Sequence, residues 1–172
     1  MELQQIIIRP WQESDAAALY KYASHPEVGP RAGWPPHKSV EESLEFIRTI
    51  FSNPTTWAIV LKETGEAMGC IGYLEKGNSN LPLNDDEAEV GYWIGYPYWN
   101  QGLCTQALAW LVEYCFEIKH LHCLWGDYYV DNPASGRVME KCGFVDTGIE
   151  TELSTLMLSS PNRKVRVMKL VH

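Results

Sequence analysis

Residues 91–105, Gly-Tyr-Trp-Ile-Gly-Tyr-Pro-Tyr-Trp-Asn-Gln-Gly-Leu-Cys-Thr, constrain the fold more than any other part of this sequence. The first residues are aromatic or β-branched, as in a strand, and Pro97 ends regular pairing because it lacks a backbone donor. Within 107–116 the apolar residues recur three and four positions apart, which predicts a helix with one buried stripe. The free N–H groups at the start of that helix form an anion site, and Gly102 lets an anion approach the backbone. The stretch therefore predicts a strand, a phosphate-binding loop and a helix, although a glycine here also suits close packing of a helix on a sheet.

Length, charge and cysteine content limit the class of protein. The 172 residues suit one domain, so we predict a single domain over 1–172 with a sizeable core. The net charge of −8 argues against a nucleic-acid partner and slightly favours a cationic partner such as an amine. No apolar run reaches membrane-spanning length and the N-terminus does not resemble a secretory signal, so we expect a cytoplasmic protein with no membrane partner. The five cysteines form no Cys-x-x-Cys pair, so neither a disulfide framework nor a metal site is expected.

The whole chain predicts a mixed α/β fold. Strands are predicted at 5–9, 57–61, 67–74, 87–96, 122–129, 144–150 and 165–171. Helices are predicted after caps at Ser14, Ser39 and Asn132, the last ending at Gly143, and over 101–118. The remaining segments are predicted as loops or turns, at 25–38, 63–66, 77–86 and 159–162. We therefore expect a central, mostly antiparallel mixed sheet of about seven strands flanked by about four helices.

Two details of these elements are open to test. The helix capped by Ser14 is expected to bury the residues Ala16, Leu19, Tyr20 and Ala23. In the Pro- and Gly-rich loop 25–38, Trp34 and His37 are candidates for lining a pocket. The alternative is that Trp34 packs the loop onto the core.

Two segments, Tyr98–Leu108 and Asn132–Phe144, resemble in this order the motifs of the GNAT N-acetyltransferase superfamily, in particular its RimJ/RimL-type branch. Residues 8–16 and 33–37 are also similar to that branch, so the resemblance covers nearly the whole chain. It implies an acyltransferase that passes an acetyl group from acetyl-CoA to a primary amine by direct attack in a ternary complex. The acceptor implied is a small-molecule amine or a peptide N-terminus, and a homodimer is the default expectation.

The resemblance also implies coenzyme-binding residues. Backbone groups are expected to bind the pyrophosphate of acetyl-CoA at Gln101, Gly102, Leu103, Cys104 and Thr105. Those expected at the pantetheine arm are Tyr92, Trp93 and Ile94. Asn132 is expected near the pantetheine or thioester, with Ser135 one turn further along the helix. A simpler alternative makes Asn132 a helix cap and Ser135 a surface residue.

The chemistry requires a base, because a primary amine with a pKa of about 10 is protonated at neutral pH. Glu87 and Glu89 are two positions apart and therefore on one face of the predicted strand. Glu89 matches the position where relatives often have a base, and Glu87 is the second candidate. Alternatively, both are solvent-exposed charges at a strand end.

The group that protonates the leaving thiolate has three candidates. Ser135 is the candidate by position, with Tyr128 or Tyr129 as alternatives. Met139 stands where many superfamily members have the tyrosine that performs this step. This departure motivates a second hypothesis, a catalytically degenerate domain that binds acyl-CoA as a sensor.

Overall fold

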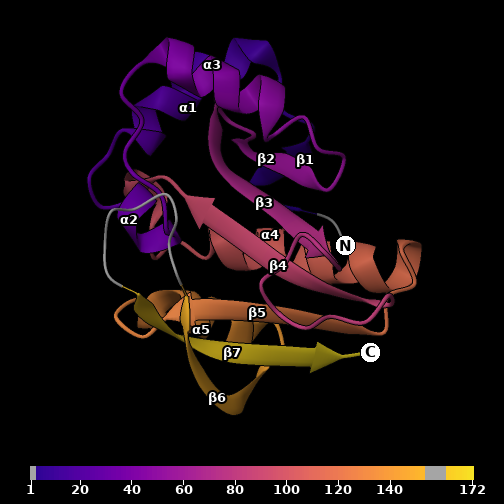
Figure 1. Cartoon of the computed structure of the whole chain (residues 1–172). Coiled ribbons are helices and arrows are strands. Elements are labelled where there is room, and N and C mark those ends of the chain that lie inside the picture. Colours follow the sequence, from indigo (N-terminus) through magenta and orange to yellow (C-terminus); the bar gives the residue numbers. More distant parts are fainter. Residues whose placement is uncertain (1–2, 154–161) are drawn as a thin grey trace.

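The computed structural model describes residues 3–153 and 162–172, and its seven strands form one sheet in the order β1-β2-β3-β4-β5-β7-β6 (Figure 1). The strands are β1 (Ile6–Arg9), β2 (Thr56–Leu61), β3 (Ala67–Glu75), β4 (Glu87–Ile94), β5 (Cys123–Tyr129), β6 (Val145–Leu153) and β7 (Arg163–Val171). The helices are α1 (Ala16–Ala23), α2 (Gly29–Ala32), α3 (Val40–Thr49), α4 (Leu103–Glu113) and α5 (Pro133–Lys141). The predicted mixed α/β class is confirmed. Of the predicted turn at 159–162, only Asn162 lies within the described residues.

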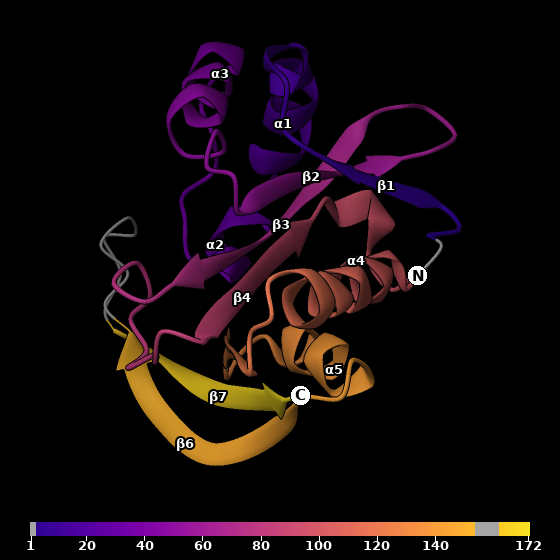
Figure 2. The same cartoon turned by 90° about the vertical axis from the view of Figure 1, so that its right-hand side faces the viewer.

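Helices cover both faces of the sheet, because its central strands carry apolar residues on both sides (Figures 1 and 2). In β2 the neighbours Ala58 and Ile59 belong to different buried clusters. The cluster with Ala58 lies under α1 and α3 and includes Leu19 and Ile47. The cluster with Ile59 lies under α4 and α5 and includes, among others, Leu108, Leu111 and Met139.

Among the described strands, only β4 and β5 pair in parallel, and they do so over a short distance. Their pairing joins Glu87–Glu89 to Cys123–Trp125. Beyond it, β4 remains paired with β3 as far as Ile94, and β5 with β7 as far as Tyr129. The two strands therefore diverge in the middle of the sheet (Figure 1), and their facing edges present backbone groups without a strand partner.

The start of α1 differs from the prediction. The chain first forms a 3₁₀ turn at Glu13–Asp15, and α1 begins at Ala16 without a side-chain cap. The carboxylate of Asp15 accepts the Gln12 N–H at 2.9 Å and both terminal nitrogens of Arg9 at 2.7 and 2.8 Å. The Ser14 cap was therefore wrong. Ala16, Leu19 and Ala23 are buried as predicted, but Tyr22, 3% exposed, takes the place predicted for Tyr20 in the core.

The loop predicted at 25–38 contains the single-turn helix α2, which its Pro and Gly content concealed. Trp34 packs on Gly29, where an added Cβ would lie 2.5 Å from the indole, and its ring centroid is 5.5 Å from that of Trp93. The His37 Nδ1 lies 2.8 Å from the buried Ser43 hydroxyl. Both residues therefore hold the loop against the core, and neither lines the cavity described below.

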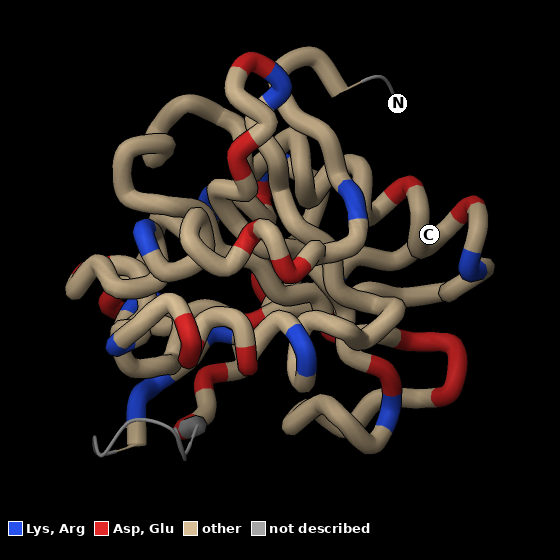
Figure 3. Tube along the Cα trace, turned by 90° about the horizontal axis from the view of Figure 1, so that it is seen from above, with Lys and Arg blue, Asp and Glu red and all other residues tan. Residues whose placement is uncertain are grey.

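Other local predictions hold. The hydroxyl of Ser39 accepts the Glu42 N–H at 3.1 Å and caps α3, and Gly65 has a φ of 71° in the turn between β2 and β3. The helix predicted at 101–118 is α4 followed by a π-helical turn at Tyr114–Ile118. In the described part of the chain, no helix has the length and apolarity needed to cross a bilayer. Lys and Arg are scattered among Asp and Glu along the chain (Figure 3).

The tight pairing of β3 with β4 leads to a stability prediction. A Cβ on Gly69 would lie 2.5 Å from the Trp93 carbonyl oxygen and 3.1 Å from Ile94 Cα, which are backbone atoms of the paired strand. We expect Gly69→Ala to lower the free energy of unfolding by about 1–3 kcal/mol, because β4 itself must move. Gly91→Ala in β4 is the matched control: nothing lies within 4 Å of its Cβ, and we expect a change within about 0.5 kcal/mol. Urea denaturation measures both, and equal losses would contradict this account.

Candidate active site

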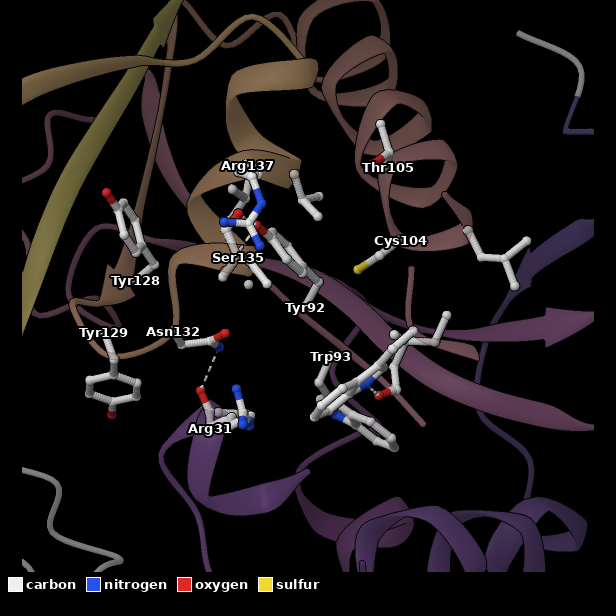
Figure 4. Close-up of a pocket in the computed structure, with 18 of the residues that line it drawn as sticks. Arg31, Tyr92, Trp93, Cys104, Thr105, Tyr128, Tyr129, Asn132, Ser135 and Arg137 are labelled. Carbon is white, nitrogen blue, oxygen red and sulfur yellow. Dashed lines mark hydrogen bonds between the residues drawn. The ribbon is translucent and has the colours of Figure 1, made fainter. Parts of the chain in front are cut away.

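A cavity of about 670 Å³ opens where β4 and β5 diverge, between α2 on one side and the helices α4 and α5 on the other (Figure 4). The predicted site residues that line it are Glu89, Tyr92, Trp93, Ile94, Gly102, Leu103, Cys104, Thr105, Asn132 and Ser135. Glu87 and Gln101 do not line it. The structure thus brings together two motifs that lie far apart in the sequence.

Alternation of side chains along the two strands divides the cavity into two halves. In the α5 half, Tyr92 of β4 contacts Ser135 of α5, and the Tyr128 ring lies against Gly136, where an added Cβ would be 2.8 Å away. In the α2 half, Trp93 packs on Trp34, and the Tyr129 hydroxyl would lie 2.5 Å from a Cβ on Gly33. Glu89 is four positions before Trp93, and Asp127 is two positions before Tyr129. Residues separated by an even number of positions on a strand point to the same face, so Glu89 and Asp127 also lie in the α2 half.

The first turn of α4 has the features predicted for a phosphate site. Gly102 precedes the helix with a φ of 75°, and no side chain of the described residues caps the helix. The N–H groups of Leu103, Cys104 and Thr105 are the ones that a helix start leaves without intrahelical partners. The side chain of Gln101 donates to the Pro97 carbonyl at 2.8 Å and so holds the loop from outside the cavity. This loop therefore presents backbone donors to an anion.

Three cations that the motifs did not predict also line the cavity. Arg137 and Lys141 are four positions apart on α5, and Arg31 lies on α2. Figure 4 shows Arg137 next to Ser135, on the side of the cavity where Thr105 lies. For Arg137 and Lys141 the only signal in the sequence was their position on the same helix as Ser135, and Arg31 lay in the loop predicted at 25–38. Cations beside a helix start strengthen an anion site, and Arg forms paired hydrogen bonds with phosphate.

A pair of hydroxyl groups lies in the α5 half. The Tyr92 hydroxyl donates to the Ser135 carbonyl oxygen at 2.7 Å, and the Ser135 hydroxyl donates to the Tyr92 oxygen at 3.1 Å. Burial raises the pKa of Tyr92, so the phenol keeps its proton at neutral pH. Only the backbone of Tyr92 was predicted to bind the coenzyme, and a role for its hydroxyl was not predicted.

Met139 does not reach the cavity. It is 1% exposed, and its sulfur would lie 2.7 Å from a Cβ on Gly126, in the core beneath β5. The residue that departs from the superfamily pattern is therefore a packing residue here. Any hydroxyl donor for the site must come from elsewhere, and Tyr92 and Ser135 supply two.

Two carboxyl groups lie in the α2 half. The Ser79 hydroxyl donates to the Glu89 carboxylate at 2.5 Å, while burial raises the pKa of Glu89 above its usual range. Burial and, second, the negative charge of Glu89 raise the pKa of Asp127 to about 7. Asp127 was missed by the sequence analysis, since its only signal was one acidic residue inside an otherwise apolar and aromatic strand.

Glu87 is placed differently. It is 7% exposed, and its carboxylate accepts the Asn84 N–H at 3.0 Å, where the chain enters β4. Burial raises its pKa, but hydrogen bonds from Asn84 and the charge of Lys169 outweigh this effect and keep the pKa below the usual value. Glu87 therefore remains an ionised structural carboxylate outside the cavity, although it shares a face with Glu89.

Asn132 connects the two halves. Its side-chain amide donates to the Arg31 carbonyl oxygen at 3.3 Å (Figure 4), and no side chain in the described residues caps α5. The predicted side-chain cap was thus wrong, although Asn132 does occupy the position before the helix. The hydrogen bond joins α5 to α2 across the cavity.

The chain belongs to the acetyltransferase (GNAT) domain family, whose model matches residues 5–145. It is 27% identical over 154 residues to the uncharacterized N-acetyltransferase YoaA of Bacillus subtilis (strain 168), a match that covers 87% of this chain and 84% of the relative. It is 33% identical over 90 residues to the ribosomal-protein-serine acetyltransferase of Escherichia coli (strain K12), covering 52% of this chain and 47% of the relative. The predicted superfamily and RimJ/RimL-type branch are confirmed.

Solved structures share the fold. The acetyltransferase (GNAT family) from Bacillus anthracis has a TM-score of 0.82 at 17% identity, covering 99% of this chain and 96% of that chain. A putative ribosomal-protein-serine acetyltransferase from Vibrio cholerae has a TM-score of 0.79 at 22% identity, with coverage of 99% and 96%. The spermidine N-acetyltransferase from Vibrio cholerae, in complex with CoA and spermine, has a TM-score of 0.74 at 17% identity, with coverage of 97% and 95%. The chain is thus an acetyltransferase of a family that uses acetyl-CoA.

The phosphate loop leads to a binding prediction with a matched control. Gly102 and Gly65 have φ values of 75° and 71°, and nothing lies within 4 Å of a Cβ on either. Alanine at either site introduces similar backbone strain, about 1–2 kcal/mol. We expect Gly102→Ala to weaken acetyl-CoA binding by about tenfold or more, because its methyl group would project where the phosphate approaches. Isothermal titration calorimetry should show no change in Kd for Gly65→Ala, and a similar loss in both variants would contradict the assignment.

Proposed function

We propose that this protein transfers the acetyl group of acetyl-CoA to a primary amine by direct attack in a ternary complex. One observation carries the proposal: a single cavity joins an uncapped helix start and cations in one half to two carboxyl groups in the other. The first half suits the phosphates of the coenzyme and the second suits a cationic amine. The reacting groups would meet where β4 and β5 diverge.

The coenzyme would occupy the α5 half. Its pyrophosphate would accept hydrogen bonds from the N–H groups of Leu103, Cys104 and Thr105, with Arg137 and Lys141 close to the same charge. Its pantetheine amides would pair with the free edge of β4 at Tyr92, Trp93 and Ile94, as an added strand does. An N–H group of this edge would polarise the thioester carbonyl.

The amine would enter from the α2 half and react in defined steps. An acceptor ammonium first gives one proton to a carboxylate of this half, for which Glu89 was the sequence prediction. The neutral nitrogen then attacks the thioester carbon, and collapse of the adduct breaks the carbon–sulfur bond. The second proton lost by the nitrogen leaves on the departing thiol, and the hydroxyls of Tyr92 and Ser135, which are hydrogen-bonded to each other, would pass it on.

An acetyl-cysteine intermediate is not part of this proposal. Cys104 lines the cavity, but burial raises the pKa of its thiol to about 12. A thiol that remains protonated at neutral pH is a poor nucleophile. Direct transfer needs no such residue.

As the acceptor we propose a protein N-terminus first. Support comes from the relative named ribosomal-protein-serine acetyltransferase, which shares 33% identity over 90 residues. An α-amino group with a pKa of about 8 also loses its proton more readily than a lysine side chain with a pKa of about 10.4. Peptides that begin with serine or alanine, compared with a polyamine and an aminoglycoside, would rank the acceptors.

The hydroxyl pair gives the prediction that tests the function. We expect Tyr92→Phe and Ser135→Ala to lower kcat for release of coenzyme A by about 10- to 100-fold, because each removes a proton donor. Acetyl-CoA affinity should change less than about threefold, since the backbone groups that bind the coenzyme remain. A thiol-reactive dye measures coenzyme A release, and Tyr114→Phe, in a tyrosine stacked on Trp110 outside the cavity, is the control.

Two other outcomes have clear meanings. Binding of acetyl-CoA without turnover on the whole amine panel would favour the sensor hypothesis. No binding would overturn the assignment of the phosphate loop.

A further inference from the structure

Asp127 occupies a particular position where the sheet opens. The last paired residues of β4 and β5 are Glu89 and Trp125, and two positions further on each strand stand Gly91 and Asp127. Gly91 has no side chain and nothing lies within 4 Å of its Cβ position, so the space in front of it is open. Asp127 therefore lies beyond the paired region and lines the cavity.

We propose that Asp127 is the catalytic residue that accepts the proton of the acceptor ammonium, with Glu89 as the charged neighbour that positions this proton. The inference rests on the proposed function and assigns the base that the sequence analysis placed at Glu89. The two carboxyl groups differ in what they already bind. Glu89 accepts a hydrogen bond from Ser79 at 2.5 Å, whereas Asp127 has no hydrogen bond or ion pair among the described residues.

The cations around Asp127 are bound elsewhere. On the neighbouring β7, Lys169 lies 4.4 Å from the Trp125 ring centroid, and Arg163 lies 3.6 Å from that of Tyr129 and 2.5 Å from the Asp131 carboxylate. On α2, Arg31 pairs with Glu27 at 3.0 Å.

The other groups facing Asp127 cannot neutralise it either. They are Glu89 on β4, the phenols of Tyr92 and Tyr129, and the apolar Val167 directly opposite on β7. A half-buried carboxylate without a partner is costly, and a bound ammonium would supply both the charge and the hydrogen bonds that it lacks.

The acid–base properties support this position. Burial and the charge of Glu89 raise the pKa of Asp127 to about 7, near the pH at which the enzyme would work. A base is most effective when its pKa lies close to the operating pH. In the proposed step Asp127 takes one proton from the ammonium nitrogen, the nitrogen keeps its electron pair for attack on the thioester carbon, and the proton later leaves to solvent.

The test is the pH dependence of kcat/KM for one amine at saturating acetyl-CoA, in the wild type and in three variants. The activity of the wild type should fall as the pH drops below a pKa of about 7, which gives the pH profile an acidic limb. Asp127→Asn should abolish this limb and lower the plateau by about 100-fold or more. Glu89→Gln should keep the limb but move it to lower pH, because it removes the charge that raises the pKa, and the plateau should fall by less than about tenfold.

Two controls sharpen the comparison. Glu75→Gln changes an exposed carboxylate at the end of β3, outside the cavity, and should match the wild type. A second amine with a different pKa distinguishes titration of the enzyme from titration of the substrate. A limb caused by the amine shifts when the amine is changed, whereas a limb caused by Asp127 stays at the same pH.

Stability measurements exclude a folding defect. The folded pKa of Asp127 lies above its unfolded value of about 3.9, so the folding free energy that it contributes is lost as pH rises through the folded pKa. At pH 8 Asp127→Asn should therefore melt no lower than the wild type, while its acetyl-CoA affinity stays the same. A variant that is stable and binds the coenzyme but turns over slowly therefore has a catalytic defect and not a folding defect.

The opposite pattern would overturn the inference. If Glu89→Gln abolishes the limb and Asp127→Asn only shifts it, Glu89 is the base. If the wild type turns over and Asp127→Asn keeps both its rate and its limb, the inference fails while the proposed function stands. If the wild type binds acetyl-CoA but acetylates no amine, both fail.

Discussion

The site depends on the limited pairing between β4 and β5, which joins only Glu87–Glu89 to Cys123–Trp125. Each strand keeps its other neighbour, β3 for β4 and β7 for β5, so the sheet stays connected while its centre opens. Backbone N–H and C=O groups at a strand edge require partners, and inside a protein their absence is costly. A ligand that carries amide groups along its length, as pantetheine does, can supply them. The opening is therefore a cavity and also a strand-shaped binding surface.

Packing behind β5 keeps this opening in place. Gly126 leaves room for the Met139 sulfur, and Gly136 leaves room for the Tyr128 ring against α5. These contacts hold α5 close to β5, and α5 carries Ser135, Arg137 and Lys141 into the cavity. The methionine that replaces a tyrosine of the superfamily pattern thus belongs to the support of the site. The site still contains a protonated phenol, because the side chain of Tyr92 extends from β4 and contacts Ser135 of α5.

Much of the fold and part of the site could be predicted from local sequence. The turn at Gly65, the cap at Ser39 and the loop at Gly102 each depend on a few adjacent residues, whose backbone preferences decide the outcome. The alternation of side chains along a strand correctly placed Glu87 and Glu89 on one face. It does not show where two strands that are distant in the sequence stop pairing. It therefore could not distinguish Glu89, inside the cavity, from Glu87, outside it. Asp127 was missed for the same reason. Ser14 failed as a side-chain cap because the adjacent Asp15 binds Gln12 and Arg9 in a 3₁₀ turn. Asn132 failed because its amide donates to the carbonyl of Arg31, which is distant in the sequence.

In the proposed function, the separation of charge between the two halves would let one cavity bind two substrates of opposite sign. Cations on α5 and the dipole of α4 favour the phosphates, and the carboxyl groups of the α2 half favour an ammonium. The two sets of charges lie on opposite sides of the diverging strands, and Arg31, the cation of α2 that lines the cavity, pairs with Glu27 at 3.0 Å. An acyl-pantetheine chain that fills the opening would also displace water from beside Asp127 and Glu89. Less water strengthens the attraction between these carboxylates and an ammonium and raises their pKa values further, so that the acceptor would meet its strongest base when the thioester is already in place.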